Sequence, residues 1–314
     1  MNNLKKIGLT ALGTAMVASS ASAATMSVSG GTSIFFGGED NSNGGNGWSM
    51  TDQVTFSASG EMDNGMTIST SLQLDGTGAV GNAAPFDDRS LTIGMDGHTL
   101  VFSGHGSSGP VGAWDDLTPS ANEESWGTSI GGTVDGPTNA TIGNNSFIYD
   151  YSVSDAIAVK AAYKPSKGTP LQSSSELGIA YTGIDGLTIK AAMGENNDAA
   201  NQADLSVFSA VYTTGPISVG YQANETDYGS GTADEDFTAM GISYAVSDDM
   251  SVSYGMSTLD YEASTKEDQD SSAVSVSFTA GGVAISASHQ STDNVAGSSS
   301  ADNTSYEINF SFSF

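Results

Sequence analysis

The chain has 314 residues, of which 36 are acidic and only 8 are basic, giving a formal charge of −28. This charge argues against nucleic acid as a partner, because phosphate binding depends on clusters of Lys and Arg. Cysteine is absent, which excludes disulfides, thiol nucleophiles and cysteine-based metal sites. A strongly acidic chain could be disordered, but the 12 Phe, 11 Tyr and 3 Trp residues fall largely on alternate positions of strand-like runs.

The N-terminal residues have the composition of a secretory signal peptide. Lys5 and Lys6 precede an apolar stretch over residues 7–17, and small residues follow up to Ala24. The apolar core is too short for a membrane anchor, which needs about 20 residues. Ala21 and Ala23 occupy the small-residue positions of a cleavage site, so we predict a cleaved signal peptide at 1–23 and one domain at 24–314. The mature domain then has six basic residues against 36 acidic ones.

From Ala24 onward the dominant pattern has a period of two, with apolar residues on one parity and Ser, Thr, Gly or Gln on the other. This alternation is typical of strands that have one apolar face. The clearest run covers residues 48–61, and similar runs recur about sixteen times in the manner of membrane-spanning strands. The apolar parity is ambiguous at 205–214 and 237–246, as in strands that face a packed loop or a neighbouring subunit.

The connections between these runs alternate between short and long. Short turns fall at 61–65, 96–98, 154–156, 183–186, 215–216, 247–249 and 280–282, and long polar loops fall at 39–47, 75–88, 105–145, 165–175, 195–204, 224–235, 259–270 and 291–302. The sequence therefore predicts an all-β fold, a sixteen-stranded antiparallel transmembrane β-barrel. A soluble β-sandwich is the alternative, but a sandwich has no reason to alternate its loop lengths.

The C-terminal strand alternates Tyr306, Ile308, Phe310 and Phe312 with polar residues and ends at Phe314. This ending resembles the insertion signal that the barrel-assembly machinery reads in outer-membrane barrels. Together with the signal peptide and the loop pattern, the whole mature chain resembles the general diffusion porins of alphaproteobacteria, which are sixteen-stranded and trimeric. The resemblance implies a homotrimer in the outer membrane of a Gram-negative bacterium, in contact with lipid and lipopolysaccharide, through which small hydrophilic solutes diffuse passively.

The resemblance also implies that the third long loop, 105–145, folds into the lumen and narrows the pore. Its acidic residues are then candidates for the constriction: Asp115, Asp116, Glu123, Glu124 and Asp135. The family usually has arginines on the opposite wall, whereas the single arginine here, Arg89, lies at a loop edge. Parity instead places Lys160, Lys164 and Lys190 on the inner face as a candidate basic wall. The excess of acids predicts a preference for cations.

Other chemistries receive less support from the sequence. A hydrolase in the barrel wall would have to use His98, His105 or His289, and none has the context of a catalytic residue, so we do not expect an enzyme. No cofactor is expected, although Asp234, Glu235 and Asp236 are a candidate structural Ca²⁺ site. Solvated loop charge is the alternative for these three acids.

Two other functions remain open from the sequence alone. A substrate-selective channel would share this barrel, although the sequence has no aromatic or arginine track to guide sugars or phosphate. A structural or adhesive surface barrel would have a blocked lumen, whereas the inner faces here have small residues. Barrel width increases with strand number, so sixteen strands favour an open pore.

Overall fold

The computed structural model describes residues 25–40, 47–75, 87–126, 136–137, 142–166, 172–197, 202–229 and 233–314. The predicted signal peptide lies outside these ranges. No helix in the described ranges is long and apolar enough to cross a membrane.

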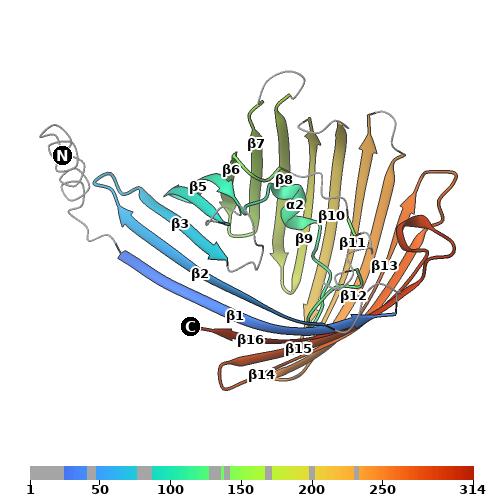
Figure 1. Ribbon diagram of the computed structural model, residues 1–314. Helices are drawn as coiled ribbons and strands as arrows, with labels where there is room; N and C mark the ends of the chain where they lie inside the picture. Colours follow the sequence, from blue (N-terminus) through green and yellow to red (C-terminus); the bar gives the residue numbers. More distant parts are fainter. Residues whose placement is uncertain are drawn as a thin grey trace, which may run out of the picture.

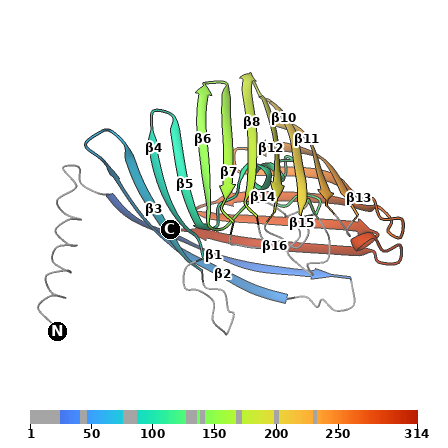
Figure 2. The same ribbon diagram turned by 90° about the horizontal axis from the view of Figure 1, so that it is seen from above.

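The described residues form a closed antiparallel barrel in which each strand pairs with its neighbours in sequence (Figures 1 and 2). The predicted sixteen-stranded barrel is therefore confirmed. The strands are β1 (Thr25–Glu39), β2 (Gly47–Glu61), β3 (Thr67–Asp75), β4 (Arg89–Met95), β5 (His98–His105), β6 (Ser146–Ser154), β7 (Ile157–Lys164), β8 (Ser174–Ile184), β9 (Leu187–Asn196), β10 (Ala203–Thr214), β11 (Ile217–Tyr228), β12 (Glu235–Ser247), β13 (Met250–Tyr261), β14 (Gln269–Ala280), β15 (Val283–Asp293) and β16 (Asn303–Ser313). In the described ranges two short helices accompany these strands, α2 (Pro110–Trp114) and η1 (Val295–Gly297).

The predicted alternation determines which face of each strand points outward. On β2, Trp48 is 68% exposed and Met50 is 62% exposed, while Thr55 on the other parity donates a hydrogen bond to Gln73 of β3. Exposed apolar side chains recur on the outer parity of strands all around the barrel. The outer face therefore suits hydrocarbon, and the inner face is lined by hydroxyls and amides.

In the two strands of ambiguous parity, burial shows which residues face the inside of the barrel. On β10, Phe208 points outward and is exposed, whereas Val207 is buried. On β12, Met240 is exposed and Phe237 is buried. Both inward residues pack against the connection between β5 and β6, which explains why apolar residues occupy both parities.

The structure differs from the sequence prediction at several strand ends and in one helix. Strand β11 continues to Tyr228, because residues predicted to begin a long loop remain paired with β10, as in Ser206 opposite Glu225. Helix α2 was not predicted. It has only five residues and begins with Pro110, a residue suited to the first turn of a helix because it needs no N–H partner there.

The barrel closes where the first strand meets the last. Gly30 and Phe314 exchange two backbone hydrogen bonds of 2.9 Å, one in each direction. A side chain at position 30 would meet the backbone oxygen of Gln53 at 2.8 Å and the ring of Phe314 at 2.9 Å, so this approach requires glycine. The C-terminal residue therefore belongs to the β1–β16 seam.

We predict that Phe314→Ala lowers the amount of barrel in the outer membrane several-fold, because it removes the terminal ring at this seam while keeping the backbone pairing. Secretion across the inner membrane should be unchanged. Quantification of the outer-membrane and periplasmic fractions checks this, with Phe312→Ala as the control from the same aromatic stripe. Equal outer-membrane levels of both variants and the unmodified protein would contradict a role for Phe314.

Candidate functional site

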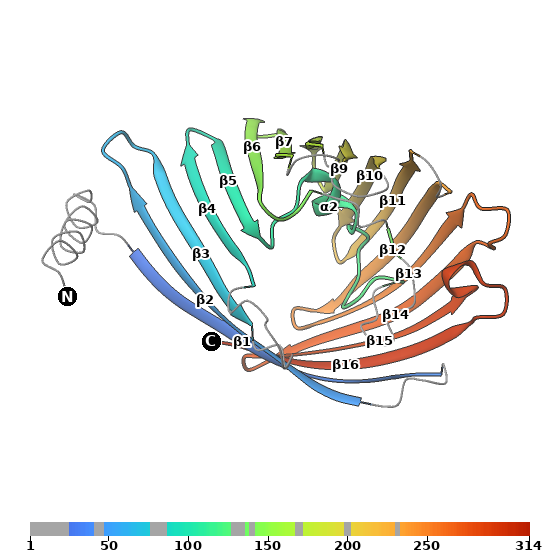
Figure 3. The ribbon, with the colours of Figure 1, turned by 45° about the horizontal axis from the view of Figure 1, so that its top comes forward.

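The described part of the connection between β5 and β6 lies along the inner face of the barrel. Helix α2 contacts β7, β8, β9 and β10, and Figure 3 shows it inside the curve of the strands. Residues 115–126 continue along the inner side chains of β11 to β16. Residues 107–126 form the inner segment.

A buried carboxylate on β8 fastens two separate parts of the connection. Glu176 is 4% exposed. Its Oε2 accepts a 2.9 Å hydrogen bond from the N–H of Val111, and its Oε1 accepts a 2.6 Å bond from the N–H of Ile142. Hydrogen bonds to a carboxylate are stronger than those between neutral groups. One side chain thus positions both the start of α2 and the return of the chain toward β6.

Apolar packing supports the same attachment. Val111 and Trp114 of α2 form a buried cluster with Leu205 and Val207 of β10, each fully buried apolar side chain contributing roughly 1.5–3 kcal/mol. The helix can approach closely because a side chain at Gly178 of β8 would collide with Trp114. Farther along the segment, the ring of Trp126 meets that of Phe237 edge-on, with centroids 4.8 Å apart and an 82° angle between the planes. Trp114 and Trp126 therefore attach the inner segment to the barrel wall at two separate positions.

Between Trp114 and Trp126, side chains of the barrel wall form hydrogen bonds with successive polar groups of the inner segment. The oxygen acceptors and donors come from β11, β13, β14, β15 and β16. The backbone N–H of Leu117 donates to Gln222 Oε1 (2.8 Å), and that of Ala121 donates to Ser253 Oγ (2.8 Å). Ser275 Oγ donates to the carbonyl of Glu123 (3.1 Å). Asn122 Nδ2 donates to Ser288 Oγ (2.8 Å) and to Glu307 Oε1 (2.9 Å). The inner segment thus follows a track of hydrogen-bonding side chains around much of the barrel.

Four of the five acids predicted for the constriction lie on this segment, and burial raises the pKa of each. For Asp115, burial and then the charge of Asp116 raise the pKa to about 7. For Glu123, burial and then the charge of Glu307 raise the pKa to about 8. For Glu124, burial and then the charge of Asp116 raise the pKa to about 6.

The fourth acid, Asp116, shares a hydrogen bond with Glu124, and burial is the main cause of its raised pKa. Ser120 Oγ also donates to Glu124 Oε1 at 3.0 Å. The inner segment therefore gathers carboxyl groups whose charge changes between mildly acidic and mildly basic pH. Asp135, the fifth predicted acid, lies outside the described residues.

The predicted basic residues lie on the wall that carries α2. Lys160 forms a 3.1 Å ion pair with Asp150 of the neighbouring strand, and Lys190 Nζ lies 5.7 Å from the centre of the Trp114 ring. Lys190 is therefore beside the inner segment and not across the lumen from it. Lys164 is the last residue of β7. Lys160 and Lys164 share the parity of the buried Ala162, and Lys190 shares that of the buried Ala192. The position of the helix could not be derived from this parity.

The remaining predicted sites fall in separate places. His98 begins β5 and stacks on Tyr151 at 4.2 Å, His105 ends the same strand, and His289 is an exposed residue of β15. Asp234 Oδ1 accepts a 2.7 Å hydrogen bond from the N–H of Tyr228. The Ca²⁺ site at Asp234, Glu235 and Asp236 stays a prediction.

Sequence reasoning missed Glu176 and Gln222, which hold the inner segment. Both are buried and lie on the inner parity of their strands. A buried charged or amide group needs hydrogen-bonding partners. That requirement was the available signal, but it does not identify the partner.

Comparison with solved structures finds similar barrels at low sequence identity. OmpT of Vibrio cholerae, an outer membrane protein in its trimer form, matches with a TM-score of 0.71 and 15% identity over 93% of this chain and all of the other chain. The anion-selective porin from Comamonas acidovorans matches with a TM-score of 0.73 and 12% identity over the same shares. A triple mutant of Rhodopseudomonas blastica porin matches with a TM-score of 0.63 and 17% identity, over 92% and 100% of the two chains.

Comparison with curated protein sequences finds no match. A family model, described as Gram-negative porin, matches residues 8–314. This match covers nearly the whole chain, and it agrees with the sixteen-stranded barrel and its outward apolar face. The chain therefore belongs to the Gram-negative porin family.

Proposed function

We propose that the chain is a passive channel of the outer membrane for small hydrophilic solutes and ions, and that it conducts cations in preference to anions. The observation that carries the proposal is the inner segment, whose four acids are held against the barrel wall. Fixed charges of one sign inside a narrow aqueous pore concentrate ions of the opposite sign. Family and fold favour a channel over an enzyme.

The path for solutes in this proposal lies between the inner segment and strands β1 to β4. These strands present hydroxyl and amide side chains on their inner faces, including Ser33, Thr55, Ser71 and Gln73. Such side chains interact with water and with many solutes without selecting one, which favours general diffusion over a substrate-selective channel. An adhesive barrel would not need a charged segment fastened inside its wall.

We also propose a homotrimer in contact with lipid, lipopolysaccharide and the assembly machinery. Strands β1 and β2 present some of the most exposed apolar side chains of the barrel, including Met26 at 77% and Trp48 at 68%. Large exposed apolar surfaces mark contacts with lipid or protein. Vibrio cholerae OmpT has been described in a trimer form, which supports the same assembly here.

Neutralising the four acids of the inner segment should lower the cation preference. We expect the permeability ratio of K⁺ to Cl⁻ to exceed one in the unmodified channel and to fall by about twofold or more in the variant, because the fixed negative charge beside the path is removed. The substitutions are Asp115→Asn, Asp116→Asn, Glu123→Gln and Glu124→Gln. Reversal potentials across a dilute KCl gradient in planar bilayers give this ratio.

The matched control removes four acids from the short turns, outside the inner segment. Its substitutions are Asp155→Asn, Asp185→Asn, Asp248→Asn and Asp249→Asn. This control removes the same number of carboxyl groups as the test variant, so a similar loss of cation preference in both would show that the preference does not depend on the inner segment. An anion preference in the unmodified channel would refute the proposal.

Cation preference should also increase with pH between about 6 and 9. The raised pKa values of about 6 for Glu124, 7 for Asp115 and 8 for Glu123 mean that each becomes negatively charged within this range. Ordinary carboxylates, with pKa values near 4, are already ionised at about pH 6 and would give a constant preference. Reversal potentials measured at several pH values distinguish the two cases. The variant without the four acids should lose the dependence, and a preference that falls with rising pH would contradict the assignment.

A further inference from the structure

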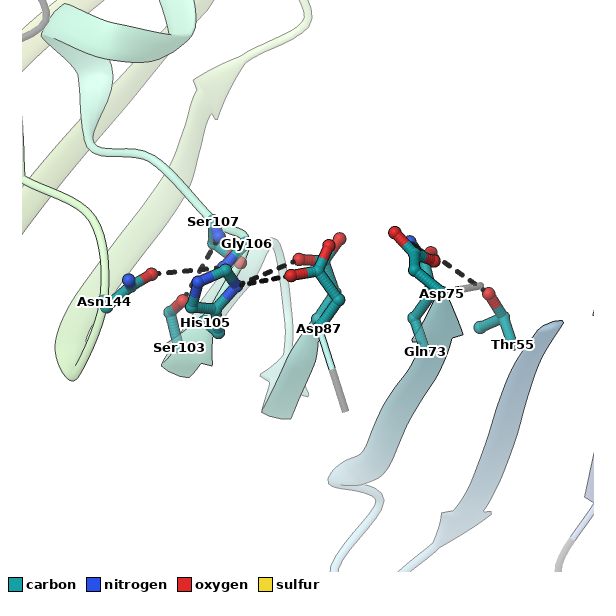
Figure 4. Close-up of polar contacts among 10 residues, drawn as sticks. Thr55, Gln73, Asp75, Asp87, Ser103, His105, Gly106, Ser107 and Asn144 are labelled. Atoms are coloured by element: carbon teal, nitrogen blue, oxygen red, sulfur yellow. Dashed lines mark hydrogen bonds and ion pairs between the residues drawn. The ribbon is translucent and has the colours of Figure 1, made fainter. Parts of the chain in front are cut away.

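Three side chains with metal-binding atoms converge at one end of the barrel, just before the start of the inner segment. Asp87 and Asp88 directly precede β4, and His105 ends β5. Their ligand atoms all lie within 4.8 Å of one another. His105 Nδ1 is 3.5 Å from Asp87 Oδ1 and 3.4 Å from Asp88 Oδ1 (Figure 4).

The backbone holds these three residues in place. The N–H of Asp87 donates to the carbonyl of Gln73 (2.9 Å), and the N–H of Gln73 donates to the carbonyl of Asp88 (2.8 Å), so both acids are fixed to β3. His105 is opposite Arg89 in the β4–β5 pairing. The next residue, Gly106, has a φ of +80°, and a side chain there would collide with the Asp88 carboxylate. The site therefore does not need to be assembled from mobile groups.

Hydrogen bonding alone accounts poorly for the geometry. The typical N–H···O distance is about 2.9–3.0 Å, so both distances from His105 Nδ1 are long for hydrogen bonds. Zinc binds nitrogen and carboxylate oxygen at about 2.0–2.2 Å in tetrahedral sites, so neighbouring ligand atoms are roughly 3.4 Å apart. The two distances from Nδ1 match this separation. A divalent cation would also neutralise the two adjacent carboxylates.

We propose that Asp87, Asp88 and His105 form a binding site for a divalent transition-metal cation of the Zn²⁺ type. Imidazole favours Zn²⁺, Ni²⁺ or Cu²⁺ over Ca²⁺ and Mg²⁺, which prefer oxygen ligands. The side chains are 45%, 46% and 42% exposed for His105, Asp87 and Asp88, so water can occupy the remaining coordination position. Asp75, drawn beside the group in Figure 4, adds negative charge at this end of β3. The proposal does not depend on ion conduction.

The test is isothermal titration of the purified full-length mature barrel in detergent with ZnCl₂. We expect one Zn²⁺ bound per chain and at least tenfold weaker binding in His105→Gln and in Asp88→Asn. Binding should weaken at acidic pH, because protons compete for the ligands. His289→Gln, which removes an exposed histidine from β15, is the matched control and should bind as the unmodified protein does. Circular dichroism verifies that each variant keeps its strand content.

Three results would overturn the proposal. Absence of Zn²⁺ binding would show that the three residues form only a hydrogen-bonded ion pair. Unchanged binding in His105→Gln, or loss of binding in His289→Gln, would assign the metal to another place. Displacement of Zn²⁺ by an equal concentration of CaCl₂ would indicate an oxygen-only site without the histidine.

Discussion

The pairing of buried polar groups between the barrel wall and the inner segment is the constraint on which the rest of the site depends. A backbone N–H removed from water without a partner destabilises the structure by about 1–3 kcal/mol. Glu176 provides two acceptors for the connection, and Gln222 and Ser253 provide others. These wall residues do not need to touch a solute, yet they determine where the charged groups of the segment lie.

The same burial that positions the acids limits their charge. Carboxylates close to one another and partly removed from water repel, so protons are retained to a higher pH. Asp116 and Glu124 share a hydrogen bond, which requires that one of the two carboxyl groups keeps its proton. The total of 36 acidic residues therefore overstates the negative charge at the inner segment near neutral pH. The negative charge beside the solute path therefore depends on where the inner segment lies as well as on how many acids it contains.

Features that depend on residues close together in the sequence could be predicted, whereas features that depend on residues far apart could not. Strands such as β2 were predicted because period-two alternation and turn residues are local features of the sequence. Docking of the inner segment depends on contacts between residues far apart in sequence, such as Leu117 with Gln222, and no local pattern encodes these. The mixed parity around Val207 and Phe237 indicated either a packed loop or a neighbouring subunit, and both residues pack against the β5–β6 connection. The position of Lys190 beside Trp114 followed only from the helix, which the sequence did not predict.

A disulfide between the inner segment and the wall tests the central claim most directly. Ser125 Oγ donates to Ser257 Oγ at 2.8 Å, and the chain has no cysteine that would interfere. Ser125→Cys combined with Ser257→Cys changes size little and places two thiols within reach of a bond. If the segment is docked in the native channel, mild oxidation should form this disulfide nearly completely and leave the single-channel conductance unchanged. Thiols that stay reduced and react freely with an alkylating reagent, or a conductance altered by the cross-link, would contradict the account.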